Sequence, residues 1–367
     1  MSVPAIDSHP PTPEANELIG TVLAVQANYY WVKLDRPLGE GQPEILLCTR
    51  RSRLKKIGQQ VMVGDRVQVE EPDWTGGRGA IALVLLRQTE LDRPPIANAN
   101  QILLVFALAE PTLDPVQLSR FLVKAESTAL EVGVCLSKSD LVSPEMQQGW
   151  RDRLQSWGYR SVLISTQTVN GLEPLRDRLQ HNITVISGPS GVGKSSLINQ
   201  LIPAVDQRTG AVSGKLGRGR HTTRHVELFE LPEGGLLADT PGFNQPDLDC
   251  KPIELAHFFP EARQRLAEAD CQFSNCLHRD EPNCAVRGEW ERYEYYLSFL
   301  EEAIDRHEAL DHQREAESTT KRKSTEAGAH YEPKLSTKKY RRPSRRQQRQ
   351  TLQGLYQDLE GTSSEAD

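Results

Sequence analysis

The stretch GPSGVGKSS, residues 188–196, decides the fold of this chain. It matches the phosphate-loop pattern G-x4-G-K-[ST] in full, with a strand-like run, ITVIS, before it and a helix-like run, SLINQLI, after it. Its glycines let backbone N–H groups turn toward a phosphate, and the start of the helix adds partial positive charge. The stretch therefore predicts a nucleoside triphosphate site at the edge of an α/β sheet.

The residues of this loop have distinct expected roles. We expect Lys194 to contact the β- and γ-phosphates and to act in catalysis, and Ser195 to ligate Mg²⁺. The other loop residues that we expect to contact the nucleotide are Gly188, Ser190, Gly191, Val192, Gly193 and Ser196.

A second motif, LLADTPGF, lies at residues 236–243. An apolar strand that ends in Asp-x-x-Gly places the Asp239 carboxylate where it reaches Mg²⁺ through water, and the Gly242 N–H where it approaches the γ-phosphate. Many GTPases orient the attacking water with a Gln directly after this motif. Phe243 stands there instead, so we expect slow basal hydrolysis.

The segment GRGRHTTRH, residues 217–225, lies between these two motifs. A threonine hydroxyl in such a segment can complete the Mg²⁺ shell when the γ-phosphate is bound. We assign this role to Thr223, with Thr222 as the alternative. His221 is the candidate within the chain for positioning the attacking water, unless it contacts only RNA or solvent.

The stretch CLSKSDLV, residues 135–142, has the pattern of a guanine-reading loop but precedes the phosphate loop. Because all ligand loops of a parallel sheet leave the same edge, the order along the chain need not match the order in space. We expect Asp140 to accept hydrogen bonds from guanine, Lys138 to stack on the base, and Ser137 to assist. Ser165 and Thr166 follow the next predicted strand and are expected near the base O6. This predicts GTP rather than ATP, although the phosphate loop alone would also allow an ATPase or a nucleotide kinase.

The rest of the chain indicates several domains. Residues 18–92 contain about five short strands and predict an oligonucleotide-binding (OB-fold) barrel, with an SH3-like barrel as the alternative. A basic loop, RRSRLKK at 50–56, is of the kind that such barrels use on nucleic acid, or it is a solvated loop. Residues 93–247 alternate strand-like and helix-like runs, which predicts a parallel sheet with helices on both faces. Residues 248–312 indicate a helical domain, in which Trp290, Tyr293, Leu297, Leu300 and Ile304 share one face of a long helix.

The helical domain contains a cluster of possible metal ligands. Cys271, Cys276, His278 and Cys284 supply three thiolates and one imidazole, a closed tetrahedral set for one structural Zn²⁺. The alternative is three unrelated thiols and a surface histidine. With no open position in such a set, a catalytic zinc is not expected.

Composition and charge limit the remaining possibilities. The net charge is −6, but residues 321–349 carry eleven Lys and Arg against two Glu. This basic part of a predicted disordered tail, 313–367, favours RNA as a partner, or it is merely solvated. The arm at 1–17 is also expected to be disordered. No apolar run approaches the ~20 residues that span a bilayer, and no signal peptide is present, so we expect a cytoplasmic protein without membrane contact.

These motifs in this order resemble the circularly permuted GTPases of the RsgA family. The resemblance covers about residues 18–310 and rests on VGDRV, ELDRP…AN, GPSGVGKSSLIN, GRGRHTTR, DTPGF and the Cys/His cluster. It implies an OB-fold barrel, a permuted GTPase domain and a zinc-bearing helical domain that use GTP, GDP, Mg²⁺ and one Zn²⁺. Ser137 departs from the family pattern, which has Asn there, and predicts a weaker hold on guanine or a less ordered loop.

The resemblance also implies a role in late maturation of the small ribosomal subunit. We expect a monomeric GTP hydrolase that binds the small subunit and its rRNA and is stimulated by that subunit. Hydrolysis of GTP to GDP and phosphate would drive its release. The alternative is a nucleotide-locked, rRNA-binding scaffold with negligible turnover.

Overall fold

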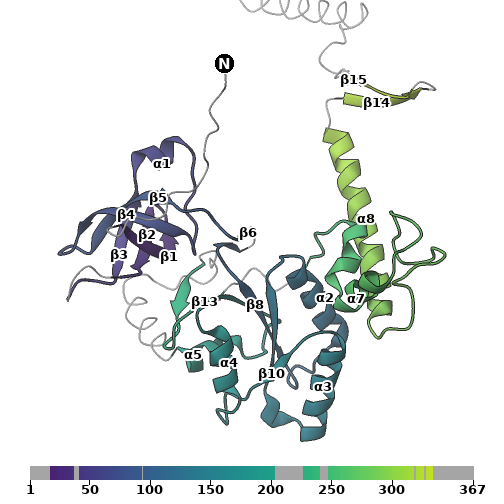
Figure 1. Cartoon of the computed structure of the whole chain (residues 1–367), viewed down its shortest axis with the longest axis horizontal. Helices are drawn as coiled ribbons and strands as arrows, with labels where there is room; N and C mark the ends of the chain where they lie inside the picture. The colour runs from purple at the N-terminus through teal and green to yellow at the C-terminus, as the bar shows by residue number, and fades with distance from the viewer. Residues whose placement is uncertain are drawn as a thin grey trace, which may run out of the picture. The chain divides into compact units, whose positions relative to one another are not determined.

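The structure is a computed structural model that describes residues 17–36, 41–92, 94–202, 226–239, 247–317, 320–325 and 328–333. The chain divides into two compact units, residues 1–304 and 305–367. Figure 1 labels most of the helices and strands of both units. None of the helices in the described ranges combines the length and the apolar character needed to cross a membrane.

The first part of unit 1 is a closed five-stranded barrel. Its strands follow the order β1-β2-β3-β5-β4, and β4 pairs with β1 to close it. All pairs are antiparallel except β3–β5, and a short helix, α1, follows β3. This confirms the predicted OB-type barrel. The elements are β1 (Leu18–Gln26), β2 (Tyr29–Leu34), β3 (Ile45–Arg50), α1 (Ser52–Lys56), β4 (Arg66–Asp73) and β5 (Arg78–Val84).

A short connector joins the barrel to the sheet and is fixed to the barrel. It contains the two-stranded pair β6 (Glu90–Asp92) and β7 (Pro95–Ala97). Asp65, fully buried in the barrel, accepts hydrogen bonds from Arg87 Nε at 2.7 Å and Nη2 at 3.0 Å. The Ala97 N–H donates to Val63 O at 2.8 Å. The motif VGDRV and the connector are therefore joined by both main-chain and side-chain bonds.

The second part of unit 1 is a six-stranded sheet in the order β10-β9-β8-β11-β13-β12. The first five strands are parallel, as predicted, and β12 is antiparallel to β13. This edge strand is a difference from the all-parallel expectation. Only the turn 231–235 separates β12 from β13, too few residues for the crossover that a parallel pair requires. The strands are β8 (Gln101–Ala107), β9 (Glu131–Ser137), β10 (Ser161–Leu163), β11 (Ile183–Ser187), β12 (Leu228–Glu230) and β13 (Leu236–Asp239).

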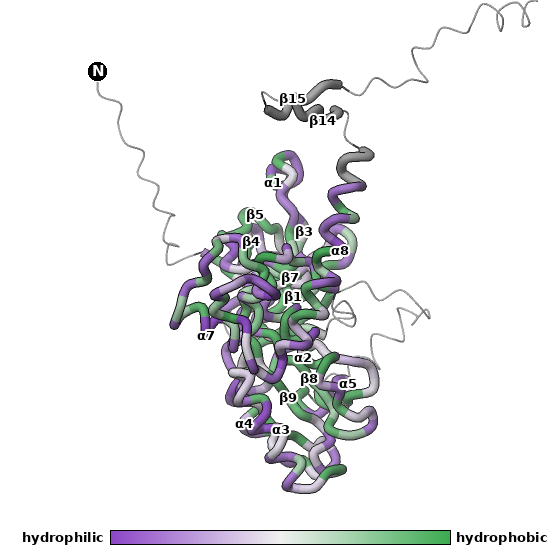
Figure 2. Tube along the Cα trace, turned by 90° about the vertical axis from the view of Figure 1, so that its right-hand side faces the viewer, coloured by the Kyte–Doolittle hydropathy of each residue, from purple (hydrophilic) through white to green (hydrophobic). Residues whose placement is uncertain are grey.

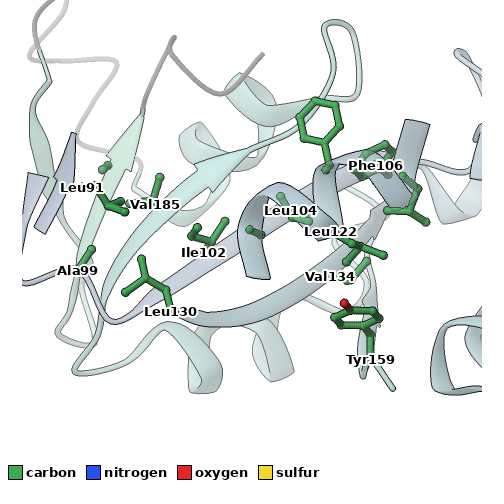
Figure 3. Close-up of a cluster of buried hydrophobic side chains, with 14 of the residues drawn as sticks. Leu91, Ala99, Ile102, Leu104, Phe106, Leu122, Leu130, Val134, Tyr159 and Val185 are labelled. Atoms are coloured by element: carbon green, nitrogen blue, oxygen red, sulfur yellow. The ribbon is translucent and has the colours of Figure 1, made fainter. Parts of the chain in front are cut away.

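Helices cover both faces of this sheet. Strand β8 is buried at every residue, and its side chains alternate between two apolar clusters. Leu104 and Phe106 belong to the cluster that includes side chains of α2 and α3 on one face (Figure 3). Leu103 and Val105 belong to the cluster that includes side chains of α4 and α5 on the other face. The chain around β8 and β9 accordingly has the hydrophobic colour in Figure 2. The helices are α2 (Pro115–Glu126), α3 (Pro144–Ser156), α4 (Leu172–Leu179) and α5 (Lys194–Leu201), with the 3-10 turn η1 (Ser139–Leu141) before α3.

The third part of unit 1 contains the Cys/His residues. Its elements are η3 (Pro252–Phe258), α7 (Pro260–Glu268) and the first part of α8 (Tyr293–Glu317). Helix α8 begins after Trp290, so Trp290 is not on its face as predicted. The most buried positions of α8 in unit 1 are Tyr296, Phe299, Leu300 and Ala303, and the predicted Tyr293, Leu297 and Ile304 lie at the margin of this face.

Unit 2 differs from the sequence expectation of a tail without regular structure. It holds the end of α8 and a hairpin of β14 (Thr320–Thr325) and β15 (Gly328–Pro333), with six antiparallel residue pairs. The sequence has little apolar patterning here, so the pairing of these two strands could not be predicted from it. The predicted boundaries between domains stay a prediction.

Candidate functional site

The candidate nucleotide loops leave one edge of the sheet. Strands β9, β11 and β13 are parallel, so the base-reading motif, the phosphate loop and Asp239 all follow the carboxyl ends of their strands. Only β8 lies between β9 and β11. Two strand spacings, about 10 Å, therefore separate the strands that carry the first two loops. One nucleotide can span this separation although the loops are reversed along the chain.

The phosphate loop joins β11 to α5 and packs tightly against β8. Gly188 has φ +143°, and a Cβ there would lie 2.1 Å from Val105 O, so no larger residue fits. Gly191 and Gly193 also have positive φ, at +81° and +93°. The Lys194 ammonium donates to the carbonyl oxygens of Gly188 at 2.7 Å and Pro189 at 2.6 Å. This keeps the lysine over the loop, where a phosphate would bind.

The other predicted residues of the phosphate loop differ in their exposure. Ser190, Gly191, Ser195 and Ser196 are exposed, so they are accessible to a ligand. Val192 is buried in the apolar cluster between the sheet and α4 and α5. Its side chain anchors the loop while its backbone stays at the sheet edge.

The base-reading motif forms a tight turn after β9. Lys138 has a left-handed conformation with φ +54°, and the residues after it form η1. The Ser139 N–H donates to Ile164 O at 3.1 Å, and Gln147 Nε2 donates to Ser139 O at 2.9 Å. Asp140 is exposed at this turn. The turn is thus held by its neighbours while the candidate guanine-reading carboxylate is accessible.

Ser137 links the base-reading motif to the phosphate loop. Its side chain is buried, and its hydroxyl lies 2.6 Å from Val192 O and 3.2 Å from Phe106 O. A hydroxyl has one hydrogen, so we assign the donated bond to the nearer acceptor, Val192 O. Ser137 thus supplies a side-chain hydrogen bond between the two loops, a role that the sequence did not indicate.

Sequence reasoning missed the loop after β8. The Glu110 carbonyl oxygen accepts a hydrogen bond from Lys138 Nζ, and Pro111 lies next to Gly191 in the phosphate loop. This loop therefore contacts both candidate nucleotide loops. It contains no known motif, but its position could have been found, because a fully apolar strand in the centre of a sheet must deliver its following loop to the same edge.

Ser165 and Thr166 lie just after β10. The Ile164 N–H donates to Leu136 O at 2.9 Å, which fixes this segment beside β9. Ser165 is buried, and its hydroxyl accepts from the Thr168 N–H at 3.1 Å in a turn closed by Asn170. The pair thus lies next to the base-reading turn, as expected from the order of the strands.

The predicted Mg²⁺ and γ-phosphate groups are only partly within the described residues. Asp239 is the last residue of β13 and lies in register with Ile186 of β11, just before the phosphate loop. His221, Thr222, Thr223, Gly242 and Phe243 lie outside the described residues.

The barrel contacts the chain between the segment GRGRHTTRH and Asp239, which includes strand β12. Ala24 of β1 forms an antiparallel bridge with Glu227, two residues after the end of GRGRHTTRH. Lys33 of β2 pairs with Glu230 at the end of β12. Leu23 shares an apolar cluster with Val226 and Leu228. The barrel is therefore in direct contact with the chain between GRGRHTTRH and the DTPG motif, the two segments that are predicted to contact Mg²⁺ and the γ-phosphate.

The four predicted metal ligands converge. The ligand atoms of Cys271, Cys276, His278 and Cys284 all lie within 4.8 Å of one another. His278 Nδ1 is 3.4 Å from Cys271 Sγ and 3.3 Å from Cys284 Sγ, and the two sulfurs are 3.9 Å apart. Tetrahedral zinc with ordinary bond lengths would set these separations at about 3.6–3.8 Å. The geometry therefore fits one such ion.

Side chains around the cluster organise its loop. The Glu281 carboxylate accepts hydrogen bonds from the N–H groups of Leu277 at 2.7 Å and Arg279 at 2.8 Å. Although burial opposes ionisation, these backbone bonds lower the pKa of Glu281 to about 2. Burial lowers the pKa of His278, which favours the neutral imidazole that a metal requires. Burial, together with the neighbouring Cys284 and Cys271, raises the pKa of Cys276 to about 12, so a cation would be needed to hold it as a thiolate.

Comparisons with known proteins identify the family. The model of the RsgA GTPase family matches residues 84–249. A protein of Trichormus variabilis named small ribosomal subunit biogenesis GTPase RsgA is 64% identical over 363 residues, covering 94% of this chain and 98% of the relative. The chain belongs to the RsgA GTPase family. A relative of the same name from Thermosynechococcus vestitus is 52% identical over 345 residues, with 94% and 98% of the two chains covered.

Two solved structures that are similar to this chain support the same fold. YjeQ from Thermotoga maritima is 32% identical with a TM-score of 0.64, covering 78% of this chain and 99% of that one. YloQ, described as a circularly permuted GTPase, is 30% identical with a TM-score of 0.66, covering 80% and 96%. Membership of the RsgA GTPase family makes this protein a GTP hydrolase that uses GTP, GDP and Mg²⁺. The Cys/His cluster can hold one metal ion.

Proposed function

We propose that this GTPase binds the small ribosomal subunit, assists its late maturation and hydrolyses GTP to leave it. The names of its relatives, small ribosomal subunit biogenesis GTPase, support this partner. The rRNA of the subunit is the expected contact, and the protein acts as a monomer in the cytoplasm, where subunits mature. The observation that carries the proposal is the convergence of the base-reading motif, the phosphate loop and Asp239 on one edge of the sheet.

Each side chain of the site has a proposed role. Asp140 accepts from guanine, Lys138 covers the base, and Lys194 neutralises the β- and γ-phosphates. Ser195 and Thr223 ligate Mg²⁺, while Asp239 reaches it through water. Ser137 links the base-reading motif to the phosphate loop through its hydrogen bond to Val192 O. The remaining proposed contacts to the nucleotide come from Ser165, Thr166, Gly188, Ser190, Gly191, Val192, Gly193, Ser196 and Gly242.

Catalysis in such a site needs an oriented water as well as neutralised phosphates. Phe243 follows the DTPG motif and has no polar group to hold water. His221 is the proposed positioning group in the chain, and the subunit supplies whatever else completes the site. Slow basal turnover and faster turnover on the subunit follow from this arrangement.

The metal cluster has a structural role in this proposal. Zinc held by Cys271, Cys276, His278 and Cys284 would have four protein ligands, which leaves no position for a reacting group. It would organise the loop that carries the four ligands, residues 271–284, so that this loop and the helices beside it can be re-aimed as one body when GTP is bound. GTP would favour docking on the subunit and GDP would favour release.

The decisive experiment is GTP turnover with and without purified small subunits. We expect clear stimulation by small subunits and none by large subunits. Stimulation by the large subunit alone would overturn the proposed partner. A pull-down of small subunits with GDP or a non-hydrolysable GTP analogue tests the cycle, because equal recovery with both nucleotides would contradict release upon hydrolysis.

Two substitutions distinguish recognition of the guanine base from the hydrogen bond that links the base-reading motif to the phosphate loop. Asp140→Ala removes the acceptor for guanine, so GTP affinity should fall while ATP affinity does not. Ser137→Ala removes the hydrogen bond to Val192 O, worth about 1–2 kcal/mol, and should weaken GTP binding about tenfold while preference for guanine persists. Loss of guanine preference in Ser137→Ala would instead show that Ser137 contacts the base. Competition of GTP, ITP and ATP against a labelled GDP measures the affinity and the base preference of each variant.

A further inference from the structure

The loop between β8 and α2 (Figure 1) is fixed at both ends. Leu108 and Leu113 are buried in one apolar cluster, and the Leu108 N–H donates to Ser137 O at 3.0 Å, at the end of β9. Residues 110–112 between these two leucines are exposed. Because β8 is parallel to β9 and β11, they lie at the same edge of the sheet as the base-reading motif and the phosphate loop. This short segment can therefore serve as a fixed support for both.

One side of the loop contacts the base-reading motif through main chain. The carbonyl oxygen of Glu110 accepts a hydrogen bond from the ammonium group of Lys138, which is half-buried. Glu110 has φ +53°, in the left-handed region that few residues other than glycine, asparagine and aspartate adopt. Since the ends of the loop are fixed, a change of this φ would displace the carbonyl oxygen from Lys138.

The other side of the loop lies against the phosphate loop. Pro111 Cδ is 3.9 Å from the point that a Cβ on Gly191 would occupy. The loop after β8 is thus in contact with the motif that is expected to read the base and with the motif that is expected to hold the phosphates. Its place between them follows from the order of the strands, in which β8 separates β9 from β11.

We propose that Glu110 is a positioning residue for the guanine nucleotide and acts through its main-chain carbonyl oxygen. This inference rests on the proposed function, in which the stem of Lys138 covers the base. A lysine stem has several rotatable bonds, and ordering it against a base costs conformational entropy. The hydrogen bond to Glu110 O orders the stem before the nucleotide arrives, so less of the contact with the base is offset by that cost.

Substitutions that differ in their tolerance of the left-handed region test this role. Valine is β-branched and strongly disfavours φ +53°, so Glu110→Val should displace the carbonyl oxygen and weaken GTP binding about 3- to 10-fold. Asparagine adopts this φ readily, so Glu110→Asn should retain most of the affinity although it also lacks the carboxylate. Thr112→Ala, at an exposed position of the same loop, is the control and should bind GTP like the parent. Competition of GTP against labelled GDP on the full chain measures these affinities.

A double-mutant cycle with Lys138→Met distinguishes positioning of Lys138 from a general loss of loop structure. Methionine keeps an unbranched stem but has no ammonium group, so Glu110 O loses its partner. In the Lys138→Met background, Glu110→Val should therefore weaken GTP binding by less than about twofold. The same factor in both backgrounds would overturn the inference. Equal losses of affinity in Glu110→Asn and Glu110→Val would also overturn it, because they would show that the carboxylate is the active group.

Kinetics give a second readout that a purely structural role would not reproduce. The base is unchanged during hydrolysis, so Glu110→Val should raise the KM for GTP and weaken GDP binding by the same factor. A fall confined to kcat would contradict the inference. If Lys138→Met alone binds GTP as tightly as the parent, the proposed cover of the base fails and the inference fails with it. All of these measurements use the free protein, so they are independent of the stimulation by small subunits that tests the proposed partner.

Discussion

The barrel and the Cys/His segment are attached to the same sheet by different kinds of interaction. The barrel is joined largely through main chain: Val63 and Gly64 lie against the connector residues Ala97 and Asn98, and β1 bridges to Glu227. The Cys/His segment, residues 247–304, is joined through side chains. A main-chain attachment tolerates most substitutions and fails only where a Cβ intrudes, whereas a side-chain attachment depends on each partner.

Arg292 is the centre of the side-chain attachment. It is fully buried, forms a two-pronged ion pair with Glu261, and lies 4.8 Å from the Trp157 ring and 4.9 Å from the Phe259 ring. Its neighbour Glu291 accepts from Trp157 Nε1 at 2.7 Å. Trp157 ends α3, the helix that begins just after the base-reading turn. The base-reading side of the sheet and the Cys/His segment therefore share this aromatic and charged cluster.

Loss of the metal should have the largest effect, and it should destabilise the Cys/His segment. Cys276→Ser removes one of four ligands, and binding of structural zinc by small peptides is worth ~10–16 kcal/mol. We expect the metal content to fall from one equivalent to near zero and limited proteolysis to cleave within 247–304, while the barrel stays protected. Cys250→Ser, at a partly buried cysteine outside the cluster, is the control and should keep the metal. An undisturbed cleavage pattern in a metal-free protein would contradict a structural role.

The next largest effect is expected at the buried ion pair. Glu261→Ala leaves the Arg292 guanidinium buried without its counter-charge, which should cost about 3–5 kcal/mol in the free energy of unfolding. A double variant, Glu261→Leu with Arg292→Met, removes both charges and should recover most of that loss. Urea denaturation of the three proteins measures the difference. A cost below about 1 kcal/mol for Glu261→Ala would show that the aromatic contacts alone hold the segment.

A substitution at one glycine should weaken the attachment of the barrel to the connector. Gly64 has φ +85°, and a Cβ there would lie 2.0 Å from Ala97 O, so Gly64→Ala must push the connector away. Gly58→Ala is the matched control, because Gly58 has φ +71° but no atom within 4 Å of a Cβ. Backbone strain should cost each variant about 1–3 kcal/mol. Gly64→Ala should therefore melt at a lower temperature than Gly58→Ala, and the difference measures the effect of the close contact with Ala97 O. Equal melting temperatures of the two variants would contradict a role for that contact.

The smallest effect is expected at the exposed pair of Lys33 and Glu230. Both side chains are partly exposed, at 27% and 43%, so solvent screens their interaction. Lys33→Ala should change the free energy of unfolding by no more than about 1 kcal/mol, and salt should remove the change. Lys55→Ala, at an exposed lysine outside the ion pairs of the described residues, is the control. A larger, salt-independent loss would mean that this side chain fixes the barrel as firmly as the main chain does.

The sequence was most informative where a motif fixes local backbone. The phosphate loop, its flanking strand and helix, and the convergence of the four candidate metal ligands could be predicted because residue type and spacing indicate them. The parallel order also followed, since alternating strands and helices leave few arrangements. Short elements were the ones missed. Strand β12 has three residues, too few to show a period, and the loop at Glu110 carries no motif.

Long-range packing explains the other misses. Arg292 is polar and would be placed on the surface from the sequence, yet it is buried, because Glu261 and three aromatic rings from distant segments surround it. Likewise the hydrogen bond from Ser137 to Val192 depends on two segments 55 residues apart. Neither partner could be identified from local sequence, and only the assembled sheet brings them together.

Strand β11 has a mechanical position that follows from the order of the sheet. It is hydrogen-bonded on one side to β8, through which the chain arrives from the barrel. On the other side it is bonded to β13, from which the chain departs toward the Cys/His segment. Tension between those two attachments therefore shears the ladders on both sides of the strand that carries the phosphate loop. A load exerted by a large RNA surface on these two chain connections would thus be transmitted in part through the strand that carries the phosphate loop.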